Sequence, residues 1–290
     1  MAPPDPAAAS ATSAPAAPSA GLALDADLSF KIGAVIVLAV LYLLFLNRFS
    51  FDLNGERYFV LSDDQMISMR YARNLATGLG PVWNPGERVE GFTNPLWTAY
   101  MALWHLVGVS PAKISLPILL TSAVILILNA LTVYSIAAKL SPRSRPVPRV
   151  AMVLAGTYWS LVHWSLEGFE VGLTALLAST VALQAFVYEE SQRTRQLVLI
   201  ALCLIALGWT RVEMLAVAGI PVAYLMLTES SRSRLFTFVA FPVAASLALL
   251  FGARFWYFGE WLPNTYYLKL TGITLRDRTF MVSKKPGRRS

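Results

Sequence analysis

The sequence predicts an all-α integral membrane protein with about seven transmembrane helices. The 290-residue chain is 56% hydrophobic and only 14% charged, and its mean hydropathy is +0.55. A soluble globular domain carries about 25% charged residues, so this composition favours a protein that lies in a bilayer. The net charge of +7 does not indicate a nucleic-acid-binding protein, because the basic residues fall in short blocks between long apolar runs. The single cysteine, Cys203, excludes a disulfide scaffold and a cysteine-based zinc site.

The chain divides into three segments. Residues 1–29 are rich in Ala, Pro and Ser and have no periodic apolar pattern, so we expect them to be disordered. Residues 30–270 form the expected transmembrane module, with a long outer loop at 47–113, and residues 271–290 form a basic tail. Acidic residues precede the first apolar run and no small-residue cleavage site follows it, which favours an uncleaved helix over a signal peptide.

Seven apolar runs, of which only the first contains a charged residue (Lys31, near its start), are the predicted membrane spans. They are residues 30–46, 114–138, 150–166, 171–188, 196–210, 214–228 and 235–253. Two of them, 196–210 and 214–228, reach only about 22 Å as helices, whereas the hydrocarbon core is about 30 Å thick. The apolar segment 95–109 is equally short and carries Trp97, Tyr100 and Trp104, which suit the headgroup region. We therefore expect this segment to lie along the membrane surface.

The charged loops predict the orientation. Basic residues gather in the loops at 139–149, 193–195 and 232–234, and these loops share one side of the membrane whether or not 95–109 crosses it. Cytoplasmic loops carry an excess of Lys and Arg. The loops on the other side, at 47–113, 167–170, 211–213 and beyond 254, hold most of the acidic residues. We expect a multi-pass plasma-membrane protein with a cytoplasmic N-terminus and its functional site on the outer, periplasmic face.

Two adjacent aspartates, Asp63 and Asp64, begin an amphipathic segment directly outside the first span. Carboxylates at a membrane–water interface can act as a catalytic base or hold a metal ion. The alternative is that Ser62 and Gln65 form a capping box and that the aspartates only complement the helix dipole.

Three further outward segments carry candidate residues. Arg211 and Glu213 separate the two short spans, so we expect them to dip into a cavity between helices, where ionisable groups are functional candidates. The alternative is a mutual ion pair that braces the turn. Glu170 lies either in the site or in a solvated turn. The aromatic segment 256–269 is typical of an interfacial belt, but it also suits stacking on sugars, and Lys269 can bind a phosphate.

The outer-loop residues resemble a known family. The segments 63–75 (DDQMISMRYARNL), 78–80 (GLG) and 83–94 (WNPGERVEGFTN) look like the first outer loop of GT-C membrane glycosyltransferases, nearest the terminal arabinofuranosyltransferase branch. The segment 260–267 (EWLPNTYY) is similar to a later outer loop of that branch, and 211–213 and 168–170 show shorter likenesses. The resemblance covers about residues 28–270, and members of the family are longer.

This resemblance implies an inverting transfer of a sugar, arabinofuranose or another pentose or hexose. The donor is a polyprenyl-phosphate sugar, and the acceptor is a cell-envelope glycan or protein on the outer face. Asp63 or Asp64 is the expected base. Arg211, Lys269 and Arg70 are the candidate phosphate ligands. The candidate substrate-binding residues are Glu170, Glu213, Trp83, Asn84, Glu90, Asn264 and Tyr266.

No cofactor is required on this interpretation, and a divalent cation, Mg²⁺ or Mn²⁺, at the two aspartates is left open. Two alternatives remain at this point. One is a transporter of a lipid-linked sugar or anion that uses the same cavity without chemistry, although the sequence shows no internal repeat of the kind many transporters have. The other is an inactive, truncated fragment.

Overall fold

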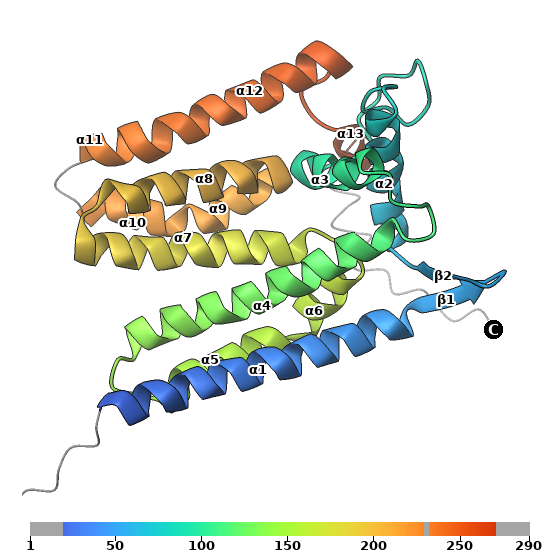
Figure 1. The fold of residues 1–290 in the computed structure, drawn as a ribbon. Helices are drawn as coiled ribbons and strands as arrows, with labels where there is room; N and C mark the ends of the chain where they lie inside the picture. Colours follow the sequence, from blue (N-terminus) through green and yellow to red (C-terminus); the bar gives the residue numbers. More distant parts are fainter. Residues whose placement is uncertain (1–19, 229–231, 271–290) are drawn as a thin grey trace, which may run out of the picture.

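The described chain is a bundle of helices that run back and forth between two ends (Figure 1). A computed structural model describes residues 20–228 and 232–270. Four helical stretches in this part are long and apolar enough to cross a membrane. They lie in α1 (Ala20–Arg48), in α4 (Ser115–Leu140), in α7 (Val171–Ser191) and in the continuous stretch of α11 (Arg232–Leu235), the π-helical η2 (Phe236–Ala240) and α12 (Phe241–Phe258).

Most residues in the apolar parts of these four helices are not buried by other parts of the protein. Only 11% of the most apolar part of α1 and 17% of that of the α11–α12 stretch is buried inside the protein. Apolar helix faces that neither pack on protein nor carry charge are suited to lipid. The chain is therefore a helical membrane protein, as its composition predicts.

The other three predicted spans are helical, but none of them is a single helix of 18 residues or more. The run 196–210 lies in α8 (Thr194–Thr210), which has 17 residues. The run 150–166 is divided at Tyr158, which has an extended backbone (φ −63°, ψ 106°), into α5 (Pro146–Thr157) and α6 (Trp159–Leu166).

The run 214–228 is divided as well, into η1 (Val212–Met214), α9 (Leu215–Ala218) and α10 (Ile220–Thr228). The interruption precedes Pro221, which has no N–H to donate to the carbonyl group four residues earlier. Seven membrane crossings therefore stay a prediction.

The first helix begins earlier than the sequence predicts. Residues 20–29, which we expected to be disordered, belong to α1. Asp27 pairs with Lys31 one turn later (2.9 Å) and accepts a hydrogen bond from Tyr134 of α4, so contacts within and between helices extend the first one. Residues 1–19 of the expected disordered segment and the basic tail at 271–290 lie outside the described residues.

The smaller elements gather at one end of the bundle (Figure 1). They are a hairpin of β1 (Ser50–Leu53) and β2 (Glu56–Phe59), and the helices α2 (Asp63–Ala76), α3 (Pro95–Leu106) and α13 (Asn264–Leu270). The hairpin, which the sequence analysis missed, turns at Asn54 and Gly55 with φ of 53° and 79°. An Asn-Gly pair with both φ positive is the preferred two-residue hairpin turn.

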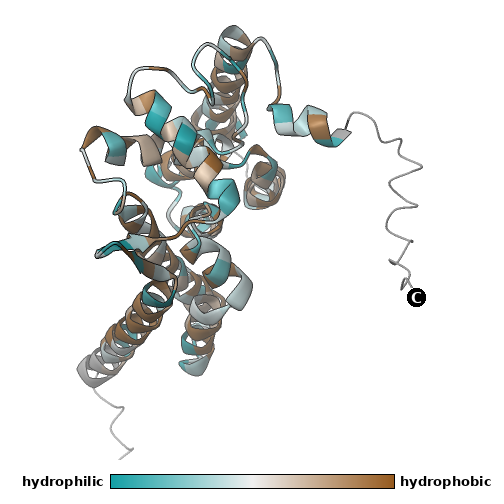
Figure 2. Cartoon of the chain, turned by 90° about the vertical axis from the view of Figure 1, so that its right-hand side faces the viewer, coloured by the Kyte–Doolittle hydropathy of each residue, from teal (hydrophilic) through white to brown (hydrophobic). Residues whose placement is uncertain are grey.

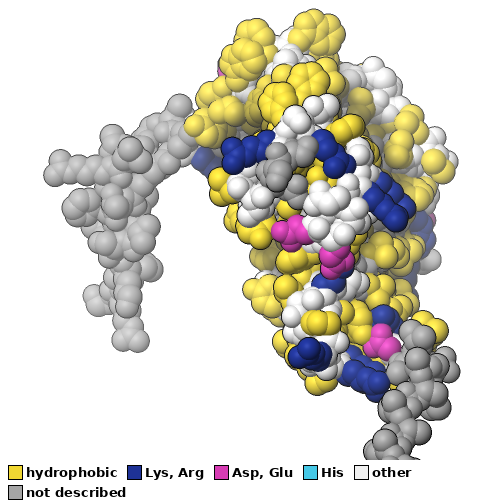
Figure 3. Space-filling view, turned by 90° about the vertical axis from the view of Figure 1, so that its left-hand side faces the viewer, with side chains coloured by type: hydrophobic (Ala, Val, Ile, Leu, Met, Phe, Trp, Pro, Cys, Tyr) yellow, Lys and Arg dark blue, Asp and Glu magenta, His cyan; other side chains and the backbone are white. Residues whose placement is uncertain are grey.

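The two ends differ in polarity. Figure 2 faces the end that carries α2 and α3 and shows hydrophilic residues in these elements, in front of the hydrophobic helices. Figure 3 faces the opposite end, where α4 ends and α5, α8 and α11 begin, and shows Lys and Arg side chains gathered there. The basic loops that the sequence predicts to share one side thus lie together in space, and the assignment of these ends to the two sides of the membrane stays a prediction.

Two apolar clusters hold the bundle together. One contains buried side chains of α1, α2, α3, α4 and α6, and the other those of α7, α8, α10 and η2. Trp97 of α3, which we expected in the headgroup belt, is 2% exposed and donates from Nε1 to the Gly168 carbonyl (2.9 Å). The turn between α6 and α7 is thereby fixed to α3, at the end where the candidate residues lie.

Candidate active site

The start of α2 is fixed by the turn between α6 and α7 instead of by a capping box. The backbone N–H of Ser62 donates to the Glu167 carbonyl at 3.0 Å. The Ser62 hydroxyl makes no capping hydrogen bond and donates to the Asp63 carboxylate (3.1 Å). The Gln65 side chain is directed to Glu170 (3.4 Å). The alternative of a capping box is therefore wrong, because the side chains of Ser62 and Gln65 have other partners.

Helix α2 separates the two aspartates. Successive helical residues point about 100° apart, so adjacent side chains cannot face the same side. Asp63 lines a cavity of about 560 Å³ together with Arg70 and Trp83. Asp64 lines a different cavity of about 170 Å³ together with Arg211 and Lys269. Of the two candidate bases, only Asp64 shares a cavity with these two cations.

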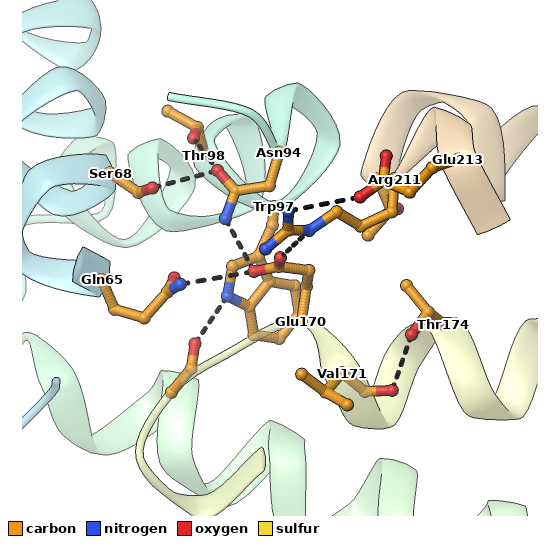
Figure 4. A network of polar contacts seen from close by, with 12 residues as sticks. Gln65, Ser68, Asn94, Trp97, Thr98, Glu170, Val171, Thr174, Arg211 and Glu213 are labelled. Atoms are coloured by element: carbon orange, nitrogen blue, oxygen red, sulfur yellow. Dashed lines mark hydrogen bonds and ion pairs between the residues drawn. The ribbon is translucent and has the colours of Figure 1, made fainter. Parts of the chain in front are cut away.

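A buried carboxylate organises the wall of the smaller cavity (Figure 4). Glu170, at the start of α7, is 1% exposed. Its side chain accepts hydrogen bonds from Arg211 Nε at 2.5 Å, Asn94 Nδ2 at 2.7 Å and Gln65 Nε2 at 3.4 Å. The side-chain oxygen Oδ1 of Asn94 accepts in turn from the hydroxyl groups of Ser68 and Thr98, at 3.0 Å each. One carboxylate thus joins α2, the residue before α3 and the turn after α8.

Arg211 is held by two carboxylates and still faces the cavities. The predicted ion pair with Glu213 is present, between Nη1 and Oε1 at 3.4 Å, but Glu170 is the closer partner. A guanidinium group has five N–H donors, so these two contacts leave others for a ligand. The Arg211 side chain is 32% exposed and lines both the 170 Å³ cavity and a neighbouring one of about 380 Å³.

The two neighbouring cavities form one polar region. Arg211 and Lys269 line both of them, and Lys269 lies on α13. The predicted substrate residues Glu213 and Tyr266 line the 380 Å³ cavity. The structure therefore brings together predicted residues from α2, the turn after α8 and α13, which are up to about 200 positions apart in the chain.

A buried ion pair behind this region was not identified from the sequence. Glu90 and Arg254 are 5% and 7% exposed. Arg254 donates from Nε to Oε2 at 2.6 Å and from Nη2 to Oε1 at 3.0 Å, and the Asn264 N–H donates to the Glu90 carbonyl at 2.9 Å. Burial raises the pKa of Glu90, against the opposing effect of the Arg254 charge. The pair ties the outer loop to α12 and to the start of α13.

The sequence contained one indication that Arg254 has a charged partner. This arginine directly follows the apolar run 235–253, and an ionisable group at the end of a span needs a partner. The predicted substrate residues Glu90 and Asn264 line a further cavity of about 350 Å³, and both oxygens of Glu90 are engaged by Arg254.

The third predicted phosphate ligand lies elsewhere. The Arg70 guanidinium stacks 4.2 Å from the centre of the Trp83 ring. It donates to the Trp83 carbonyl (3.1 Å) and to Asn84 Oδ1 (3.2 Å). The prediction that Arg70 joins Arg211 and Lys269 is not met, because Arg70 lies on the Asp63 face of α2.

The two aspartates do not form a joint metal site in this arrangement, since they face different cavities. Within residues 20–228 and 232–270, no group of three or more His, Cys, Asp or Glu side chains is placed to hold a metal ion.

The fold and the site define a helical membrane protein with a polar, cation-lined cavity at one end, and comparison with known proteins gives a relationship. The chain is 26% identical over 224 residues to the terminal beta-(1->2)-arabinofuranosyltransferase of Mycobacterium tuberculosis, and the match covers 72% of this chain and 35% of that protein. A stretch of 47 residues is 51% identical to the protein of the same name from Corynebacterium glutamicum, over 16% of this chain and 7% of that protein.

The chain thus spans only about a third of the length of the Mycobacterium relative. No protein-family model matches the chain, and no solved structure matches it. The two similarities support the relationship to arabinofuranosyltransferases that the outer-loop residues indicate.

Proposed function

We propose that this chain carries the catalytic site of a membrane glycosyltransferase that uses a polyprenyl-phosphate sugar. The observation that carries this proposal is the single polar region that Asp64, Arg211 and Lys269 line at one end of the bundle. A carboxylate can act as a general base, and cations can stabilise a phosphate leaving group. The relationship to two arabinofuranosyltransferases points to the same chemistry.

Asp64 is the proposed base. It accepts the proton of an acceptor hydroxyl as that oxygen attacks the anomeric carbon of the donor sugar. The bond between this carbon and the phosphate oxygen breaks, and its electron pair leaves with the polyprenyl phosphate. Attack from the side opposite the leaving group inverts the anomeric centre. The phosphate leaves as an anion, so it needs positive charge and no proton donor.

Arg211 and Lys269 supply this positive charge. Glu170 holds the Nε edge of the Arg211 guanidinium, which fixes the plane of the group while its other N–H donors stay available. Glu170 and Glu213 are in this respect positioning residues. Tyr266, 48% exposed on the same cavity wall, offers a ring face to a sugar.

The distribution of charge supports an outer location of the site. Lys and Arg side chains gather at the end opposite to α2 and α3, and basic ends face the cytoplasm in membrane proteins (Figure 3). With seven crossings and a cytoplasmic N-terminus, the polar region lies on the outer face, next to a cell-envelope glycan or protein acceptor. The names of the two relatives make arabinofuranose the first sugar to test.

The test compares the two aspartates. Release of free polyprenyl phosphate from a polyprenyl-phosphate arabinofuranose is measured with the purified chain, together with binding of the same donor. Asp64→Asn should lower turnover by about 10²–10⁴-fold and leave donor binding intact, because an amide cannot act as a base. Asp63→Asn, the matched control on the other face of α2, should keep turnover. Full turnover with Asp64→Asn, or donor binding that needs neither Arg211 nor Lys269, would contradict the proposal.

A further inference from the structure

A further cavity lies on the other face of α2 and is not used by the proposed reaction. It has a volume of about 560 Å³, and α2, the end of α3 and the segment before α4 form its wall. Much of this wall is apolar. Met66 and Met69 contribute from α2, and Pro111 and Ile114 contribute from the segment before α4. Methionine side chains adapt to irregular apolar ligands.

Cationic side chains stand on the same wall. Arg70 and Arg73 line the cavity one turn apart, and Asp63 is its only acidic lining residue within the described chain. Arg70 is fixed by Trp83 and Asn84, whereas no hydrogen bond or ion pair joins the Arg73 side chain to another described residue. Burial, with a contribution from the Arg73 charge, lowers the pKa of His105, so this histidine is neutral at pH 7. The cavity therefore has a net positive charge with Arg73 available.

The cavity lies where a spanning helix meets the outer end of the bundle. Ile114 directly precedes α4, one of the four candidate spans. Next to it, at the end of α3, three apolar side chains are more than half exposed: Leu103 is 55%, Leu106 65% and Val107 73% exposed. Apolar side chains exposed together at such a position are typical of a surface in contact with lipid.

We propose that this cavity binds an anionic phospholipid, separately from the sugar donor. The lipid phosphate pairs with Arg73, with Arg70 beside it, and an acyl chain lies along the half-exposed Met66, in front of the buried Met69 and Ile114. A soluble phosphate compound would use the arginines but would leave the apolar wall in contact with water. The two cavities adjoin at Ile67, but Arg73 lines only this one and Arg211 does not line it, so we expect the phosphates of the lipid and of the donor not to compete. The inference does not depend on the proposed reaction.

Binding of dioctanoyl phosphatidylglycerol to the purified chain in detergent tests this proposal, with native mass spectrometry or calorimetry as the readout. Arg73→Gln should weaken binding about tenfold or more, the typical effect of losing a hydrogen bond to a charged group. Met66→Ser, at a position that is 49% exposed, should weaken it by removing contact with the chain. Arg88→Gln is the matched control, because Arg88 is an exposed arginine at the same end that stacks on Tyr257.

Each of the following three results would contradict the proposal. Equal losses with Arg73→Gln and Arg88→Gln would show unspecific attraction and overturn the proposal. Competition by glycerol phosphate as effective as that by the lipid would assign the cavity to a soluble anion instead. Equal binding of dioctanoyl phosphatidylcholine would overturn the selectivity for an anionic headgroup. The melting temperature of each variant shows whether the fold is retained, and binding is expressed per folded molecule.

Discussion

Removing the Arg254 side chain should destabilise the protein strongly, because it leaves the Glu90 carboxylate buried without its partner. Glu90 is 5% exposed, and both of its oxygens accept from Arg254, at 2.6 and 3.0 Å. Breaking a buried ion pair by removing one partner typically costs about 3–5 kcal/mol. We expect Arg254→Met to lower the apparent melting temperature in detergent by on the order of 10 °C.

The loss of stability in Arg254→Met should depend on pH, because Glu90 can take up a proton. Burial raises the pKa of Glu90 above its ordinary value, so the folded protein binds this proton more tightly than the unfolded chain. The contribution of Glu90 to the free energy of unfolding is therefore largest below the ordinary pKa and is lost as the pH rises through the folded-state pKa. Without the Arg254 charge this pKa rises further. The defect of Arg254→Met should thus be large at about pH 8 and shrink towards about pH 5.

The partner variant should behave differently. Glu90→Gln leaves Arg254 buried and unpaired, and an arginine stays protonated throughout this pH range. Its defect should therefore shrink only as far as the wild-type Glu90 itself becomes protonated, which happens at a lower pH than in Arg254→Met, because the Arg254 charge lowers this pKa. The double variant Glu90→Gln/Arg254→Met should recover most of the loss, because removing both charges leaves neither one unpaired.

Thermal unfolding of the three variants at both pH values checks this reasoning. Arg88→Met is the control, since replacing an exposed arginine that only stacks on Tyr257 should change stability by about 1 kcal/mol or less. An Arg254→Met protein as stable as this control, or one whose defect is the same at both pH values, would refute the role given to the pair.

Two further predictions concern the turn between α6 and α7 and the topology. Gly168 has a φ of +94°, and an added Cβ would lie 2.5 Å from a methyl carbon of Leu61, so Gly168→Ala should cost about 1–3 kcal/mol in thermal unfolding. Gly252→Ala in α12, where a Cβ would meet nothing within 4 Å, should be neutral or stabilising, and equal losses in both would contradict the argument. In a cysteine-free background, a cysteine at Asn54 in the hairpin turn should react with an impermeant thiol reagent in intact cells, and one at Ser144 in the basic loop should not. The reverse labelling would place the polar region on the cytoplasmic face.

The sequence by itself determined the class of protein and the location of most candidate residues. Hydrophobic content and the lengths of uncharged runs are additive, local properties, so they predict a helical membrane protein without knowledge of its packing. The amphipathic pattern after Asp64 likewise predicts α2, and the outer-loop residues indicate the relationship to arabinofuranosyltransferases that the two relatives support.

Only the tertiary structure decided which of these residues meet. Which adjacent aspartate faces Arg211 depends on the rotation of α2 about its axis, and hydrogen bonds to Glu167 and Glu170, about 100 positions away in the chain, fix that rotation. The pairing of Glu90 with Arg254, 164 positions apart, depends on the packing of a loop against α12. Such long-range contacts follow from how helices rotate and pack against one another, and no local pattern of residues contains that information.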